Sequence, residues 1–332
     1  MEGGLTVFQV AAGNNELTSS IVNRQFHETV GEFVAIVPPS LKVADELFAA
    51  AVRQFSHDHA AALLFLKSNP LLTLACGLLP ASCLPFAFSP QGNSVVVISK
   101  SAWSQVGDTI DVSDPIREWL MRAVMAGKRL IGSSIEMTGD ATNRLTEDLP
   151  DLGPGQPQQS DWLHSKLSEL PLNAILPSIA SEADATALQA GFLLMNDFLD
   201  ASHTFSQSVE GAGRHVAGDY WHAIMHRREP DYSNSKYWFR RVGDHPLFGQ
   251  LASFAGLALD NRSSTEANGW KLRLGVSGQW DPFAFVDMCQ LCAKTADFEL
   301  CEVAQEIQFA EMLLLLAATF HDAAGTSNEF FR

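Results

Sequence analysis

Residues 219–245 read DYWHAIMHRREPDYSNSKYWFRRVGDH, and no other stretch of the chain has a comparable composition. It holds all three tyrosines of the sequence, two of its seven tryptophans and three of its ten histidines, together with four arginines and four carboxylates. Surface segments rarely carry so many aromatic rings, and core segments rarely tolerate so many charges. The mixture is typical of a pocket lined by rings and paired ions.

The sequence on both sides of this stretch is helical in pattern. Residues 182–209 form the longest uninterrupted helical candidate, and its middle is apolar on nearly all sides, which predicts a buried helix. Further helices are expected at 219–229, 233–241, 246–259, 282–293 and 299–318, with a loop at 261–278. Together these segments predict a C-terminal helical bundle.

The N-terminal part of the chain has a different pattern. Strands expected at 5–10, 33–37, 94–98 and 130–137 alternate with helices expected at 41–55, 60–67 and 116–126. The segment DLGPGQPQQS at 151–160 is rich in glycine and proline, so it is expected to be a linker. The predicted fold class is α+β: a small mixed α/β domain at 1–150, a linker at 151–160, and a predominantly α-helical domain at 161–332.

Charge and composition exclude several classes of function. The net charge of −16 argues against nonspecific binding to nucleic acid or to an anionic membrane, which needs a basic surface. The first residues lack the pattern of a secretory signal, and the longest apolar run, 60–84, is too interrupted for an isolated membrane span. Five scattered cysteines predict reduced thiols, so we expect a cytoplasmic protein.

A candidate metal site lies in the central stretch. His222, His226 and Glu229 are spaced by four and three residues, so they project from one face of a helix. Two such histidines can share a divalent ion, and Glu229 and His203 would add ligands for zinc, iron or manganese. The zinc-protease motif is excluded, because it requires Glu where this chain has Ala223. Metal binding, a metal-free functional site and a purely structural network all remain open.

The preceding helix offers a second interpretation of the same region. Asp200 and His203 lie one turn apart, and a carboxylate beside a histidine is a recurrent acid–base arrangement. A buried hydrogen-bond network is the preferred explanation of the pair. The candidate catalytic residues are therefore Asp200, His203, His222, His226 and Glu229.

Arginines and aromatic residues form a candidate ligand-binding set. Paired arginines bind carboxylate or phosphate in a bidentate fork, and they also stack on aromatic rings. The candidates are Arg227, Arg228, Tyr237, Trp238, Arg240 and Arg241. For any single arginine, an ion pair within or between helices is the preferred explanation. On an otherwise acidic chain the whole cluster favours a small anionic ligand.

The segments YWHAIMHRREPDYSN at 220–234 and KYWFRRVG at 236–243 resemble an uncharacterised family of microbial proteins. The resemblance extends from about residue 161 to the C-terminus and also includes Asp200, His203, Ser206 and Gln207. That family has no assigned activity, so the resemblance implies no substrate or cofactor. It supports residues 196–245 as the functional site.

The leading hypothesis is an enzyme that acts on a small anionic metabolite in a pocket lined by histidine, arginine and aromatic residues. Metal-assisted chemistry and proton transfer are both possible mechanisms in such a pocket. The alternative is a noncatalytic scaffold or interaction module that uses an aromatic and arginine-rich surface, since tyrosine, tryptophan and arginine are enriched in interface hot spots.

Overall fold

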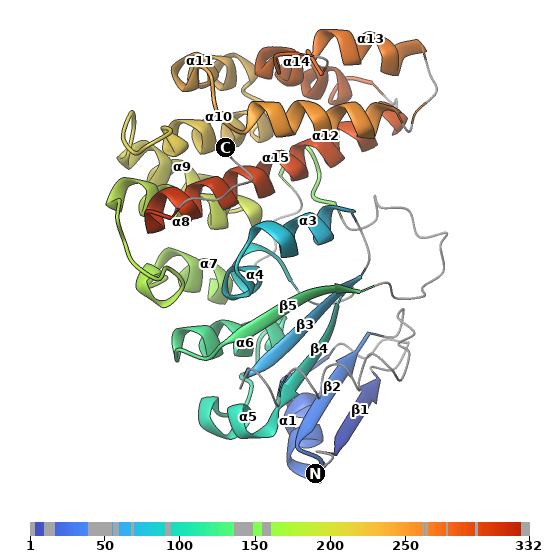
Figure 1. Ribbon diagram of the computed structural model, residues 1–332, viewed down its shortest axis with the longest axis vertical. Helices are drawn as coiled ribbons and strands as arrows, with labels where there is room; N and C mark the ends of the chain where they lie inside the picture. Colours follow the sequence, from blue (N-terminus) through green and yellow to red (C-terminus); the bar gives the residue numbers. More distant parts are fainter. Residues whose placement is uncertain are drawn as a thin grey trace. The chain divides into compact units, whose positions relative to one another are not determined.

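The fold is described from a computed structural model (Figure 1). It describes residues 4–9, 17–38, 55, 60–67, 70–89, 94–135, 149–154, 161–260, 262, 265–276, 278–295 and 298–326. The chain divides into two compact units, Met1–Arg144 and Leu145–Arg332. The first contains a mixed sheet and the second is helical, so the fold is α+β with a C-terminal helical bundle, as predicted.

The first unit is built on a five-stranded sheet of order β1-β2-β4-β3-β5. Its strands are β1 (Leu5–Gln9), β2 (Phe33–Val37), β3 (Ala62–Lys67), β4 (Ser94–Ser99) and β5 (Leu130–Ile135). The outer pairs β1–β2 and β3–β5 are parallel, whereas β4 is antiparallel to both of its neighbours. The helical elements are α1 (Ser19–Glu28), α3 (Pro70–Leu78), η1 (Ala81–Cys83), α4 (Leu84–Ala87), α5 (Lys100–Val106) and α6 (Pro115–Met125).

The prediction of a helix at 60–67 is wrong, because this segment forms the inner strand β3. Ala62, Leu63 and Leu64 are buried, and the strand pairs with β4 on one side and β5 on the other. A strand covered on both faces reads as a continuous apolar run, which periodicity alone does not distinguish from a buried helix. The helix expected at 41–55 lies, apart from Phe55, outside the described residues.

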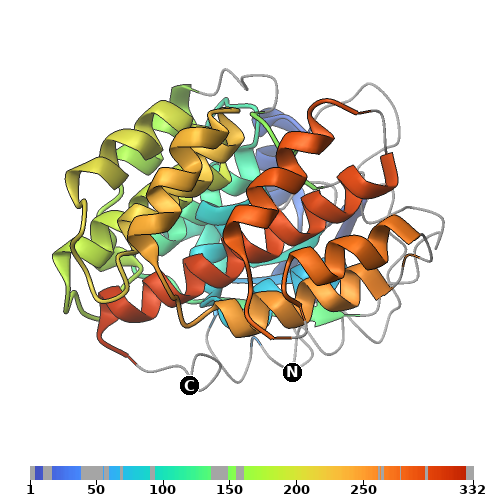
Figure 2. The same cartoon turned by 90° about the horizontal axis from the view of Figure 1, so that it is seen from above.

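The second unit is a bundle of helices. In chain order these are α7 (Asp161–Ser168), η3 (Leu172–Ala174), α8 (Glu182–Met195), α9 (Leu199–Ser208), α10 (Ala217–Arg228), α11 (Tyr232–Val242), α12 (Phe248–Asp260), α13 (Thr265–Arg273), α14 (Pro282–Cys292) and α15 (Phe298–Ala324). Figure 2 shows α15, in red, passing between the yellow-green and the orange helices, and its packing partners include α8, α12 and α14.

The expected single helix at 182–209 is two helices, because the chain turns between α8 and α9. Asp197 adopts a left-handed conformation with φ of 63°, and the Phe198 amide donates to the Leu193 carbonyl. Aspartate is one of the few residues that tolerate this conformation. The loop expected at 261–278 contains a further helix, α13, whose Ala267 and Trp270 are buried at helical spacing.

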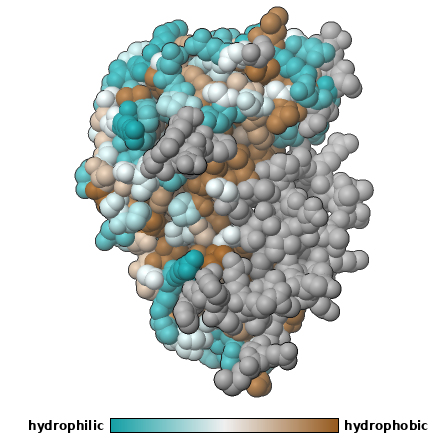
Figure 3. Space-filling view, viewed as in Figure 1, coloured by the Kyte–Doolittle hydropathy of each residue, from teal (hydrophilic) through white to brown (hydrophobic). Residues whose placement is uncertain are grey.

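Helix α15 is long and apolar enough, by length and composition, to cross a membrane. In this protein 89% of its most apolar window is buried, so it is the core helix of the bundle. The outer surface of the helical unit mixes hydrophilic and hydrophobic residues on the face drawn in Figure 3.

The central helix of the site, α10, is buried along its whole length, since all 12 of its residues are buried. It packs against α8, α9 and α11. Its approach to α8 is close because Gly191 leaves room for the Trp221 ring, whose indole nitrogen donates to the Thr319 hydroxyl. A Cβ at position 191 would lie 2.6 Å from Trp221 Cζ2 and 2.9 Å from Leu316 Cδ1.

We expect Gly191→Ala to lower the free energy of unfolding by about 1–3 kcal/mol, because overpacking outweighs the better helix propensity of alanine. Gly269→Ala in α13 is the matched control, since among the described residues no atom outside its own stretch of helix lies within 4 Å of the added Cβ. It should raise the stability by up to about 1 kcal/mol. Urea denaturation measures both changes, and equal effects of the two substitutions would contradict the packing described.

Candidate functional site

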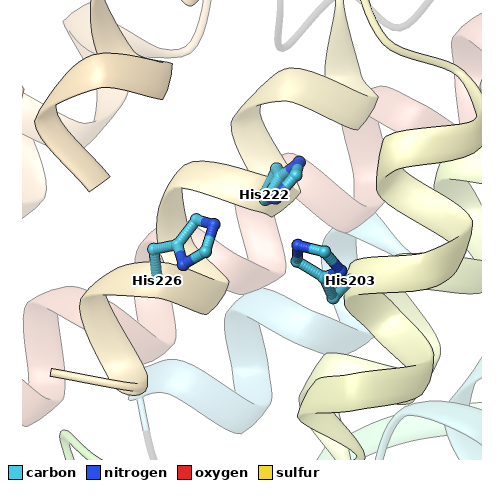
Figure 4. Close-up of side chains that lie close together, drawn as sticks. All are labelled: His203, His222 and His226. Atoms are coloured by element: carbon cyan, nitrogen blue, oxygen red, sulfur yellow. The ribbon is translucent and has the colours of Figure 1, made fainter. Parts of the chain in front are cut away.

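Three histidines converge between α9 and α10 (Figure 4). His222 and His226 are four residues apart and project from one face of α10, while His203 reaches them from α9. One ring nitrogen from each of the three lies within 4.8 Å of the others. The rings of His203 and His222 meet edge to face, with centroids 4.5 Å apart, so all three side chains point into one small volume.

His222 is the most enclosed member of this group. It is 1% exposed, and neither of its ring nitrogens has a hydrogen-bond partner among the described residues. The Trp238 ring from α11 stacks on the His222 ring, with the two ring centroids 3.8 Å apart. Burial, followed by the nearby His226 and His203, lowers the pKa of His222 to about 3. The imidazole is therefore neutral at physiological pH, and its lone pair is available to a metal ion.

His226 is held by two neighbours. Its Nδ1 lies 3.0 Å from Glu229 Oε2, and its Nε2 lies 2.9 Å from Asn234 Nδ2. Burial lowers the pKa of His226, although the Glu229 carboxylate acts in the opposite direction. The Glu229 side chain is 52% exposed, so this carboxylate orients His226 from the edge of the site. Glu229 was predicted as a metal ligand, whereas the structure places it as a partner of a candidate ligand.

The turn between α10 and α11 brings Asn234 and Trp238 against the histidines. Asp231 caps α11 by accepting a hydrogen bond from the Asn234 amide at 3.1 Å. One turn into the helix, the buried Ser235 hydroxyl donates to the Ala223 carbonyl at 2.8 Å. This pair of contacts folds α11 back along α10. The residues between 230 and 238 therefore complete the site that α9 and α10 begin.

Asp200, the remaining catalytic candidate, is exposed on the first turn of α9. It is not a member of the cluster formed by His203, His222 and His226. Sequence reasoning missed Asn234, whose amide contacts His226. The helix predicted from 233 does place Asn234 at its start, but the sequence does not predict that its side chain contacts His226.

Arg227 is fully buried and pairs with a carboxylate in the core. Its Nη2 lies 2.5 Å from Glu311 Oε2 on α15, and both side chains are 0% exposed. The Tyr220 hydroxyl donates to the other oxygen of the same carboxylate at 2.9 Å, and Gln308 accepts from Arg227 Nε. The sequence predicted that Arg227 would bind an anionic ligand. In the structure the anion that it binds is the side chain of Glu311, in the same protein.

Arg228 binds the ends of two chain segments. Its guanidinium donates to the Leu194 carbonyl at the end of α8 and to Asp197 Oδ1 at 2.6 Å. It also donates to the carbonyls of Asp151 and Gly153, which belong to the described part of the predicted linker. A cation is favourable at a helix C-terminus, where carbonyl groups lack partners. Residues 155–160 of that linker lie outside the described residues.

The remaining ligand candidates lie on α11. Arg241 forms ion pairs with Asp219 and Glu210. Its guanidinium also lies over the Trp238 ring, with Cζ 5.0 Å from the ring centroid. Trp238 is buried against His222, whereas Tyr237 is exposed. Arg240 contacts a different region, the Phe283 ring on α14. The six predicted ligand-binding residues therefore do not face one pocket, and only Trp238 stacks directly on a cluster histidine.

We expect Arg227→Met to lower the free energy of unfolding by about 3–5 kcal/mol, because it leaves the buried Glu311 without its cation. Arg240→Met is the matched control at an exposed arginine and should change stability by less than about 0.5 kcal/mol. Adding Glu311→Leu to Arg227→Met should recover much of the loss. A small effect of Arg227→Met in urea denaturation would contradict a structural role for this arginine.

The stability of the metal-free protein should fall as the pH falls below 6.5. Since the pKa of His222 is about 3 in the folded protein and 6.5 ordinarily, only the unfolded chain takes up this proton between those values. The loss from this group is about 2 kcal/mol between pH 6.5 and pH 5. His222→Gln should flatten the profile by that amount in denaturation measured across this range. Identical profiles would show that His222 is not held neutral by burial.

Comparison of the chain with protein-family models, with curated proteins and with solved structures gives no match. Function is therefore inferred from the geometry of His203, His222 and His226 and from the chemistry of the residues that surround them.

Proposed function

We propose that His203, His222 and His226 bind one divalent metal ion, and that this ion is the catalytic centre of an enzyme. The single observation that carries the proposal is the convergence of three imidazoles from two helices, with nitrogens within 4.8 Å of one another. Three protein ligands with a fourth position left for water or substrate is the usual composition of a catalytic zinc site.

The unpaired nitrogens of His222 favour a metal over a structural hydrogen-bond network. A buried polar group without a partner costs about 1–3 kcal/mol. In a structural network both ring nitrogens would be expected to find partners, and here neither does among the described residues. Coordination would satisfy one of them. Direct stacking on Trp238 fixes the ring in place without using either nitrogen.

The surroundings of His226 also fit a ligand. Metal-binding histidines almost always donate their second ring nitrogen to a carboxylate, a carbonyl or water. Glu229 Oε2 occupies this position at Nδ1, which leaves Nε2 for the ion. Asn234 Nδ2 now lies 2.9 Å from that nitrogen, so its amide would move aside when a metal binds.

Metal binding requires the three rings to approach one another. Zinc–nitrogen distances of 2.0–2.1 Å in a tetrahedral site place the nitrogens about 3.3 Å apart, closer than the 4.8 Å limit that describes the cluster. We propose that the His203 and His226 side chains rotate toward His222, which Trp238 holds, to make up the difference. Imidazole ligands suit zinc and iron better than manganese, which prefers oxygen, so zinc and then iron are the first candidates.

The proposed substrate is a small anion. Three neutral imidazoles leave the full charge of the ion uncompensated, unlike sites with carboxylate ligands, and the ion would then be the largest local charge in the site. A carboxylate or similar group could coordinate at the open position beside a metal-activated water. This attraction replaces the predicted arginine clamp, since Arg227 and Arg228 are engaged in the core.

The alternative function, an interaction module built on tryptophan and arginine, has less support. Trp221 and Trp238 are both buried, and Arg241 is engaged with two carboxylates. An interface hot spot requires such side chains at the surface.

Elemental analysis of protein purified without a metal-affinity step should find close to one zinc or iron per chain. His222→Ala/His226→Ala should lose the metal while remaining folded by circular dichroism. His164→Ala, at an exposed histidine of α7, is the control that should keep it. Cobalt loaded in place of the native metal should show the visible absorption of a low-symmetry site.

Two further variants make the test specific to the geometry. Glu229→Gln should weaken metal binding by about 10–100-fold, because it weakens the partner of His226. Asn234→Ala should preserve or strengthen binding, because it removes the competitor at Nε2. Absence of metal after incubation with zinc, iron and manganese would refute the proposal. Equal binding by the double variant would show that the metal lies elsewhere.

A further inference from the structure

A groove of about 630 Å³ lies in the helical unit, apart from the histidines. It is formed where the end of α11, the start of α12 and the residues that lead into α14 meet, and its aromatic walls are Phe239, Phe248 and Phe283. This volume is within the range of small-molecule sites, which combine apolar walls with a few polar groups.

Helix α11 separates this groove from the histidine cluster. Trp238 stacks on His222, whereas Arg240 lines the groove. Two residues on a helix differ by about 200° in direction, so these side chains point to opposite sides of α11. A ligand in the groove would therefore not depend on a metal bound by the histidines.

Two of the residues that line the groove carry hydrogen-bond donors that have no acceptor among the described residues. Trp280 is 2% exposed, and its indole Nε1 is buried without a partner. Arg240 is exposed, and its guanidinium lies over the Phe283 ring, with Cζ 5.8 Å from the ring centroid. A buried indole N–H usually has an acceptor, so an external acceptor would satisfy it.

Each carboxylate of the groove, by contrast, already accepts a hydrogen bond from within the chain. Asp281 caps α14 by accepting from the amides of Phe283 and Ala284 at 2.8 and 3.1 Å. Asp244 accepts from the Gln279 side chain at 3.1 Å. These carboxylates keep their negative charge, so they would repel a second negative charge on a ligand.

The backbone around Trp280 is fixed before any ligand arrives. Gly275 has a φ of +67°, and a Cβ there would lie 1.9 Å from the Gln279 carbonyl oxygen, so only glycine fits this turn. The Asp281 amide then donates to the Leu274 carbonyl at 3.0 Å. The turn holds Trp280 and Asp281 in position at the groove.

We propose that this groove binds a flat aromatic monocarboxylate. The Arg240 guanidinium would hold the carboxylate in a bidentate fork, and the Trp280 N–H would donate to an acceptor on the ligand. The aromatic part would lie against the phenylalanine rings. A phosphate or other dianion fits less well, because Asp244 and Asp281 stand beside the single cation.

The test is calorimetric titration of the full chain with 2-naphthoate, its uncharged analogue 2-naphthamide, and inorganic phosphate. We expect 2-naphthoate to bind, and Arg240→Gln to weaken it about tenfold or more through loss of a charge-assisted contact. The amide should bind the native chain no better than 2-naphthoate binds Arg240→Gln. Phosphate should not bind. In ¹H–¹⁵N spectra the Trp280 indole signal, assigned with Trp280→Phe, should shift downfield with 2-naphthoate.

Arg273→Gln is the matched control, because Arg273 also covers an aromatic ring, that of Trp270, but does not line the groove. It should leave binding of 2-naphthoate unchanged. Failure of 2-naphthoate to bind, equal weakening by both arginine variants, or preferential binding of phosphate would each overturn the proposal. Binding of 2-naphthoate should be unchanged in His222→Ala/His226→Ala and after treatment with a chelator. The titration therefore tests the groove independently of the proposed metal centre.

Discussion

The buried pair of Arg227 and Glu311 fixes the rotation of α10, and the rest of the site depends on that rotation. Tyr220 and Arg227 are seven residues apart and both bind the same Glu311 carboxylate on α15. Trp221 and Arg228, with the same spacing, face α8, where Gly191 and the Leu194 carbonyl receive them. His222 and His226 lie about 200–240° from Tyr220 on the helix wheel. They therefore point away from α15, toward His203 on α9.

A helix with this composition can occupy the core only if every charged group finds a partner there. Glu311 is the carboxylate that makes the central position possible for Arg227, and it precedes the apolar run of α15 at 312–318. Removing one partner of such a pair is costly, although buried ion pairs as a whole add little to stability compared with well-packed apolar residues. What the pair does provide is one orientation of α10, and the candidate metal centre needs that orientation.

The sequence predicted the grouping of the histidines better than the partners of the arginines. The spacing of His222 and His226 and the position of His203 on the neighbouring helix follow from helical periodicity, which is a local property. The role of the arginines does not follow in the same way. Two adjacent arginines such as Arg227 and Arg228 are typical of an anion-binding site. Only their burial beside Glu311 and Asp197 identifies them as members of ion pairs within the chain. The break at Asp197 and the strand at 62–67 likewise depend on distant partners: the Arg228 guanidinium, and the strands β4 and β5.

The four described residues at the start of the glycine- and proline-rich segment have a consequence for how this chain could be recombined. The carbonyls of Asp151 and Gly153 accept from Arg228, and Gln308 donates to those of Asp151 and Leu152. These carbonyls serve as acceptors for buried donors of α10 and α15. A natural fusion or exchange that joined the helices to a different N-terminal partner at residue 161 would leave those buried donors without acceptors. Viable breakpoints should therefore fall before residue 151, upstream of the segment whose composition predicts a linker.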